Sequence, residues 1–398
     1  MESGAVEVLV RGADAPALDL IAETTALADG VASPSGARVL IVVPDRTRAF
    51  PLREVLPALI GRLLERGAMV ARITVAVASG THRPADHELS ARHLGELPPG
   101  VRVLRHDADA TGTRCGMTPA GTPVEVNPAL LESDTVLALG TIVFHYFAGF
   151  GGGGKMLFPG LGTRNAIAAN HRRALGPLPP GGLAPGVEPG RLEGNPVAWD
   201  LADVHALLPA ASHLTLWPVT GGFAGSRWRT PGEFRALSAR YADGRHVGAR
   251  AAYDVVLATC AGPGGLDVVQ AHKALFHAAL YSKDGGEVIF EAACPEGAGS
   301  AAMERWLASP DRAALEREAR RDYDLNAQTA ISLAAIAERV RVTWVSPEPL
   351  PALARWGVRR ANDATLESAR ASFAVGDGAR IARIPVPTDV LPADPVAS

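Results

Sequence analysis

Several hallmarks of common protein classes are missing from this sequence of 398 residues. No apolar run reaches the roughly 18 residues typical of a membrane-spanning helix, so no transmembrane segment is expected. The N-terminal stretch MESGAVEVLVRGADAP lacks a basic region followed by an apolar one, so it does not predict a signal peptide. These absences predict a cytoplasmic protein that does not act at a membrane.

Cysteine and basic charge are also scarce. The three cysteines (Cys115, Cys260 and Cys294) are scattered and form no CxxC pair, which argues against a disulfide framework and a cysteine zinc site. The net charge is −3, whereas nucleic-acid-binding domains carry a strongly basic surface, so no nucleic acid is expected as a partner. Arginine supplies most of the basic residues, which makes the rare Lys155 and Lys273 more informative.

What is present is the composition of a folded protein with more than one core. Apolar residues make up 47% of the chain and charged residues 20%, as in globular proteins. Because domains usually contain about 100–200 residues, two are expected. We predict an N-terminal domain over residues 1–247 and a C-terminal α/β domain over residues 248–375 that closes the cleft. The tail, residues 376–398, is expected to return to the first domain.

Short apolar runs alternate with helical spacing along both halves of the chain. In the first half, the runs typical of buried parallel strands are 39–43, 73–77, 101–104 and 135–139. Helical spacing appears between them at 52–66 and 86–94, and a second such pattern begins at 253–258. This alternation predicts an α/β fold: two α/β domains with mostly parallel sheets and an active-site cleft between them.

Polar clusters follow three of the expected strands, at residues 45–48, 79–82 and 106–107. Ligands of such sheets bind beyond the carboxyl ends of the strands, so these clusters are candidate site segments. For the pair His106-Asp107, we favour a structural role over catalysis.

The most unusual segment is glycine-rich and runs from residue 144 to residue 160, with four consecutive glycines before Lys155. Consecutive glycines let backbone N–H groups approach an anion closely. The spacing from Gly149 to Lys155 matches a P-loop, but Met156 stands where a Mg²⁺-binding hydroxyl is needed. Pro159 would also break the helix that holds the phosphates, so this interpretation is rejected.

Taken together, these segments resemble the nickel-dependent lactate racemases and their 2-hydroxy-acid racemase and epimerase relatives. The resemblance covers most of the chain and rests on the order and approximate spacing of several motifs. They are Asp45-Arg46-Thr47-Arg48, the run ASGTHRP at 78–84, residues 145–160 with a Gly-Phe-x-Gly-Gly-x-Lys core, Asn170-His171, Gly194-Asn195-Pro196, Gln270-x-x-Lys273 and the CPEG run at 294–297.

The resemblance implies a nickel-pincer nucleotide as cofactor, a pyridinium mononucleotide whose sulfur-bearing arms hold nickel. Lys155 would form the covalent thioamide link to it, and His171 would supply the remaining nickel ligand. Both assignments fit the chemistry, since a desolvated lysine is a nucleophilic amine and neutral imidazole suits nickel. The other implied cofactor-binding residues are Asp45, Arg48, Gly152, Gly153 and Gly154.

The resemblance also implies a racemase or epimerase that inverts C2 of a small 2-hydroxy acid by reversible hydride transfer to the cofactor. His82 and His145 match the paired acid/base histidines, because histidine titrates near operating pH. Arg48 and Lys273 are the expected partners of the substrate carboxylate or of the cofactor's carboxylate and phosphate groups. Gln270, one helical turn before Lys273, is expected to face the same cleft and bind the substrate. The implied protein partners are those that synthesise and load the cofactor.

This sequence departs from the family pattern at three positions. Gly151 stands where the core often has Ser. Val269 precedes Gln270 where lactate-acting members tend to carry Tyr, and Leu325 stands in the place of a Trp. These changes predict a different and more open pocket wall.

Two other functions fit parts of the pattern. A nicotinamide-dependent 2-hydroxy-acid dehydrogenase would explain the α/β pattern and the histidines, but no G-x-G-x-x-G joins a strand to a helix. A non-catalytic nucleotide-binding protein would explain the glycine loop alone.

Overall fold

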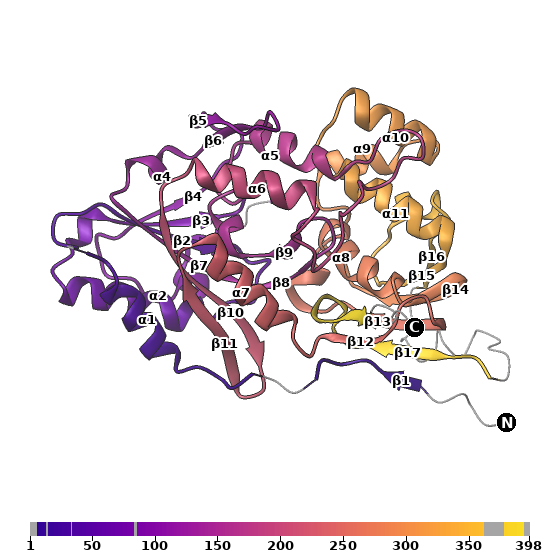
Figure 1. Ribbon diagram of the computed structural model, residues 1–398, viewed down its shortest axis with the longest axis horizontal. Coiled ribbons are helices and arrows are strands. Elements are labelled where there is room, and N and C mark those ends of the chain that lie inside the picture. Colours follow the sequence, from indigo (N-terminus) through magenta and orange to yellow (C-terminus); the bar gives the residue numbers. More distant parts are fainter. Residues whose placement is uncertain (1–5, 13–14, 33, 83–85, 362–377, 394–398) are drawn as a thin grey trace.

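The computed structural model describes residues 6–12, 15–32, 34–82, 86–361 and 378–393. It contains two six-stranded sheets that lie in the two halves of the chain (Figure 1). Arg83 and Pro84 of the ASGTHRP run, and residues 376–377 and 394–398 of the tail, lie outside the described residues.

The first sheet has the strand order β11-β10-β7-β2-β3-β4. Its strands are β2 (Val39–Pro44), β3 (Ile73–Ala78), β4 (Arg102–Arg105), β7 (Thr135–Thr141), β10 (Ala211–Val219) and β11 (Gly222–Trp228). All neighbours are parallel except the β10–β11 hairpin. Every residue of β2 is buried, as expected for a central strand covered by helices on both faces.

The second sheet has the order β1-β17-β13-β14-β15-β16, and all its neighbours are parallel. Its strands are β1 (Val6–Val8), β13 (Tyr253–Thr259), β14 (Ser282–Glu291), β15 (Arg341–Val345), β16 (Arg359–Ala361) and β17 (Ile381–Ile384). The predicted α/β class with mostly parallel sheets is therefore confirmed. The exact domain limits at 247, 248 and 375 stay a prediction.

The two ends of the chain pair differently from what the sequence suggested. β17 of the tail lies between β1 and β13, so the N-terminal strand and the tail both extend the second sheet. The tail was expected to return to the first domain, and its end does contact that part of the chain, since Leu391 packs with Phe144 and Trp217. Further along, β18 (Leu391–Ala393) pairs with β12 (His246–Ala249), the segment at the expected boundary.

Helices cover both sheets, and smaller hairpins complete the fold (Figure 1). The helices are α1 (Leu20–Asp29), α2 (Leu52–Glu65), α3 (Ala91–Leu94), α4 (Pro128–Glu132), α5 (Arg164–His171), α6 (Pro196–Ala206), α7 (Pro231–Ala242), α8 (Val268–Ala279), α9 (Ala301–Leu307), α10 (Arg312–Arg321), α11 (Ala327–Arg339) and α12 (Pro351–Ala354). The small strands β5 (Thr113–Met117) and β6 (Pro123–Val126) form one hairpin, and β8 (Val143–His145) and β9 (Gly149–Gly151) form another. Within the described part of the chain, no helix is long and apolar enough to cross a membrane.

Candidate functional site

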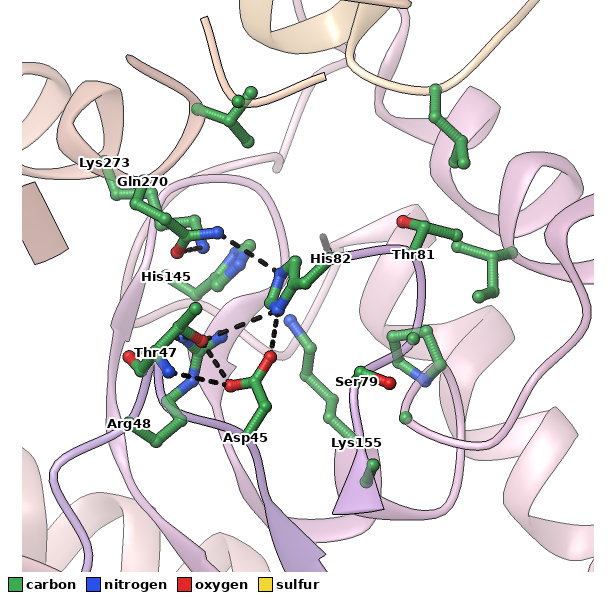
Figure 2. Close-up of a pocket in the computed structure, with 18 of the residues that line it drawn as sticks. Asp45, Thr47, Arg48, Ser79, Thr81, His82, His145, Lys155, Gln270 and Lys273 are labelled. Atoms are coloured by element: carbon green, nitrogen blue, oxygen red, sulfur yellow. Dashed lines mark hydrogen bonds and ion pairs between the residues drawn. The ribbon is translucent and has the colours of Figure 1, made fainter. Parts of the chain in front are cut away.

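A single cavity between the two halves collects most of the predicted site residues (Figure 2). Those that line it are Asp45, Arg48, His82, His145, Gly152, Lys155, His171, Gln270 and Lys273. They come from the ends of β2 and β3, the β8–β9 hairpin, the glycine loop and 3₁₀ helix that follow it, α5 and the start of α8. Gly153 and Gly154 do not line this cavity; they pack behind it, against Phe234 and His205.

Asp45 and His82 form a hydrogen-bonded pair at the carboxyl ends of adjacent strands. The His82 Nδ1 lies 2.6 Å from the Asp45 Oδ2, and Asp45 is buried. The Thr47 hydroxyl and backbone N–H both donate to the other carboxylate oxygen of Asp45, at 2.5 and 3.0 Å. Burial alone would raise the pKa of Asp45, but His82, Arg48 and Thr47 outweigh it and hold that pKa below its ordinary value. An ionised Asp45 fixes a proton on the His82 Nδ1 and leaves Nε2 as the basic atom.

The second half of the chain completes this arrangement through α8. The Gln270 Nε2 lies 3.2 Å from the His82 Nε2, and the Lys273 Nζ donates to the Gln270 Oε1 at 2.7 Å. Asp267 caps the helix by accepting the Gln270 N–H at 2.8 Å, which fixes the helix start beside the cavity. Asp45, His82, Gln270 and Lys273 thus form a continuous chain across the two halves (Figure 2).

The glycine loop brings Lys155 to the same cavity by a backbone route that side chains would block. Gly152 has φ +75°, and a Cβ placed there would lie 1.6 Å from the Thr141 carbonyl oxygen. The chain then continues as a short 3₁₀ helix, Gly153–Met156, rather than the α-helix of a P-loop. This tight passage over β7 explains why glycine is required before the lysine.

Replacement of this glycine should therefore be severe. We expect Gly152→Ala to lower the free energy of unfolding by at least about 3 kcal/mol, through steric overlap and left-handed strain. Gly36→Ala is the matched control, because Gly36 has φ +77° but no atom within 4 Å of the added Cβ. That variant should lose only about 1–2 kcal/mol in denaturant titrations. Equal losses in the two variants would contradict the close approach.

The pKa values of Lys155 and of the two histidines beside it are all lowered. Burial, with the charges of Lys273 and Arg48, lowers the pKa of Lys155 well below its ordinary value. Burial and the same cations, together with Lys155, also bring the pKa of His145 well below the usual range. Burial and nearby Lys155 lower the pKa of His171 to about 3. The site therefore offers a readily deprotonated amine and two neutral imidazoles.

Two of these groups are also unsatisfied. The His171 Nδ1 is buried without a hydrogen-bond partner. Among the described residues, the Lys155 amine has no hydrogen-bond or ion-pair partner and only faces the Phe147 ring, 5.5 Å from its centroid. Buried polar groups are rarely left unpaired, so the His171 Nδ1 indicates a ligand that the polypeptide itself does not supply.

Lys273 makes stability depend on pH. Burial, with the charge of Arg48, lowers its pKa to about 7, against about 10.4 in an unfolded chain. Between these values the unfolded state binds one proton more, so stability rises with pH. From about pH 7.5 to about pH 9, we expect the free energy of unfolding of wild type to rise by about 1–2 kcal/mol relative to Lys273→Met. If the free energy of unfolding changes with pH in the same way in wild type and in Lys273→Met, Lys273 is not desolvated.

Comparison with known proteins identifies a family that matches the first part of the chain. Residues 17–177, which carry all the first-half segments of the site, match the family described as lactate racemase N-terminal domain. This match assigns residues 17–177, and not the whole chain, to that family.

Two lactate racemases illustrate how far the similarity extends. The enzyme of Thermoanaerobacterium thermosaccharolyticum is 28% identical over 282 residues, which are 68% of this chain and 63% of that relative. The enzyme of Lactiplantibacillus plantarum is 35% identical over 136 residues, 33% of this chain and 32% of the relative. The aligned segments thus span less than two thirds of either relative.

Solved structures extend the fold likeness beyond the aligned sequence. The lactate racemase apoprotein from T. thermosaccharolyticum superposes with a TM-score of 0.81 at 22% identity, over 98% of this chain and 95% of that one. A Thermotoga maritima protein gives a TM-score of 0.71 at 15% identity, over 97% and 100% of the two chains. Both halves therefore share the fold of the lactate racemase apoprotein.

The structure adds contacts around this site that sequence reasoning missed. Tyr146, next to His145, exchanges a 2.7 Å hydrogen bond with Thr329 of α11. Arg46 forms an ion pair at 2.7 Å with Glu296 of the second half. Both contacts join the halves at the cavity, and neither has a local sequence signal. Asp267 was detectable in principle, because an Asp directly before an apolar helical run is a capping signal.

His106, His272 and Cys294 have surroundings that indicate a structural role rather than a catalytic one. The His106 Nε2 lies 2.8 Å from the Gly162 carbonyl oxygen, and the His272 Nε2 lies 3.1 Å from the Ser332 hydroxyl. Cys294 is fully buried. None of the three lines the site cavity.

Proposed function

We propose that the protein is a racemase or epimerase that inverts C2 of a small 2-hydroxy acid, with a nickel-pincer nucleotide as cofactor. The observation that carries the proposal is the shared cavity of His82, His145, Lys155 and His171. The lactate racemases among its relatives support inversion as the reaction.

The residues present fit this cofactor. The Lys155 amine lines the cavity with a pKa well below its ordinary value, which suits a covalent attachment, and the unpartnered His171 Nδ1 belongs to an imidazole free to bind a metal. Within the described residues, no group of three or more His, Cys, Asp or Glu is placed to hold a metal ion. Nickel would accordingly need further ligands from the nucleotide. When bound, the cofactor supplies the acceptor and donor of the C2 hydride.

His82 is suited to handle the proton of the substrate hydroxyl. Its Nδ1–H is held by Asp45, so Nε2 is the atom that accepts the proton. The Gln270 amide nitrogen lies 3.2 Å from this atom, and the substrate hydroxyl would displace that amide. His145 is the second proton handler: it is neutral, buried, and backed by Tyr146 and Phe147. A planar 2-keto acid held between the two imidazoles can be reduced on either face.

Arg48, Gln270 and Lys273 are proposed to bind the substrate carboxylate. The Arg48 guanidinium is steadied by donating to the Thr47 hydroxyl at 2.8 Å. Lys273 is held by Gln270, and a bound carboxylate would raise its pKa and keep it charged. These three groups would bind the substrate carboxylate while the His82 Nε2 contacts the substrate hydroxyl.

The test is to produce the protein together with the cofactor-synthesis enzymes. We expect one cofactor mass on the peptide that contains Lys155, about one nickel per chain, and loss of optical activity from an enantiopure 2-hydroxy acid. Protein without adduct and without nickel, made beside a lactate racemase that does become loaded, would contradict the proposal.

A further inference from the structure

Beyond α8 and its cap, the described residues of the second half contribute only neutral side chains to the cavity. These residues are Gly299, Ser300, Leu325, Asn326, Gln328 and Thr329. None is aromatic, and none is acidic or basic. This wall therefore offers nothing to pair with a second carboxylate and no ring on which an aryl group can stack.

The polar part of this wall lies next to the groups that handle the substrate. The loop before Ser300 is held to the start of α8 by the Val268 N–H, which donates to the Gly297 carbonyl at 2.9 Å. Gly299 packs directly on Asp267, where an added Cβ would lie 2.6 Å from the carboxyl carbon. Because Asp267 caps the helix that places Gln270 against His82, Ser300 lies near the reacting end.

Asn326 and Ser300 form a pair with one acceptor and one donor to spare. The Asn326 Nδ2 donates to the Ser300 Oγ at 2.8 Å, and the Met303 N–H donates to the same oxygen at 3.1 Å. The Ser300 hydroxyl proton remains to be donated. The Asn326 Oδ1 has no hydrogen-bond partner among the residues that the structure describes. A hydroxyl group, which both donates and accepts, complements this pair.

The backbone at Asn326 is also unusual. Its φ is +68°, in the left-handed region that few residues other than glycine adopt readily, and asparagine tolerates it best. Val269, beside Gln270, lines the same cavity and has a short side chain. We propose that the preferred substrate is a 2-hydroxy acid with at least one further hydroxyl beyond C2, an aldonic acid, whose tail hydroxyl binds Asn326 and Ser300. This inference rests on the proposed function and names the substrate class for that cavity.

The first test compares 2,3,4-trihydroxybutanoate with lactate as substrates of the cofactor-loaded protein. We expect kcat/KM to be at least about tenfold higher for the trihydroxy acid, as two added hydrogen bonds allow. Asn326→Gly keeps the left-handed backbone and removes the amide, so this preference ratio should fall about tenfold. Ala251→Gly is the matched control, since Ala251 also has positive φ (50°) but does not line the cavity. It should leave the ratio unchanged.

Binding to protein without cofactor gives an independent readout. Calorimetry should give a lower Kd for the trihydroxy acid than for lactate, and Asn326→Gly should abolish the difference. If Asn326→Gly does not fold, Val269→Phe, which fills part of the same cavity, should reduce the preference instead. Equal or better use of lactate, or a ratio insensitive to both variants, would overturn the inference while leaving inversion intact. Inversion of neither acid by loaded protein would instead reject the proposed function.

Discussion

Lys155→Met is expected to lose the cofactor adduct completely and to reduce inversion of any 2-hydroxy acid to background. Methionine has nearly the length of lysine but lacks the amine, so it fills the same space without a nucleophile. The fold should survive, and the free energy of unfolding should stay equal or rise, because the variant no longer buries an amine without a polar partner. Intact-mass spectrometry, chiral chromatography and denaturant titration measure the three effects.

Lys283→Met is the matched control. Lys283 is an exposed lysine whose Nζ pairs with Asp254 at 2.9 Å, far from the cavity lining. Its loss should leave both adduct and turnover unchanged, and stability should change by less than about 1 kcal/mol. An adduct that persists in Lys155→Met, or disappears only in Lys283→Met, would contradict the role given to Lys155.

His82→Asn and His145→Asn should each reduce kcat for inversion by about 10²–10⁴-fold, the usual contribution of a positioned acid or base. Asparagine keeps a polar group of similar reach but cannot take up a proton near neutral pH. Nickel content and the mass of the adduct should remain those of wild type, because neither histidine is assigned to hold the cofactor. This combination separates loss of proton transfer from loss of the cofactor.

His87→Asn is the control for these variants, since His87 is exposed on a surface turn and does not line the cavity. It should keep full turnover. Asp45→Asn should behave like His82→Asn, because Thr47 donates to the oxygen that remains, so the new amide N–H faces the His82 Nδ1 and shifts the imidazole proton to Nε2. Retained turnover in both His82→Asn and His145→Asn would remove the proposed acid/base pair.

The strands that carry the site were predictable because their sequences are unambiguous. The runs that became β2, β3 and β7 are apolar, short and bounded by polar residues, which is what burial in a parallel sheet demands. Since such strands end at one edge of the sheet, the polar residues after β2 and β3 were expected near each other, and Asp45 indeed contacts His82.

The pairing of the chain ends was not predictable in the same way. β1 and β17 have only three and four residues, and their sequences do not indicate which strands they pair with. Their pairing joins residues separated by almost the whole chain, Val6 with Ile381, so it is decided by tertiary packing alone. A local pattern therefore could not tell to which sheet the tail belongs.

Part of the site wall escaped prediction for a related reason. Ser300 and Asn326 are ordinary loop and helix-start residues in the sequence, and only the meeting of α9, α11 and α8 places them at the cavity. The Arg46–Glu296 ion pair and the Tyr146–Thr329 hydrogen bond likewise need both halves in place.

The fate of the hydrogen at C2 tests the central chemistry most directly. Loaded protein is given an enantiopure 2-hydroxy acid that carries deuterium at C2, in ordinary water, and both enantiomers are then separated and weighed by mass spectrometry. Hydride transfer and return predict that the inverted product keeps its deuterium. Replacement of the label by solvent hydrogen in the inverted product would mean that the base removes C2–H as a proton, and would contradict the account.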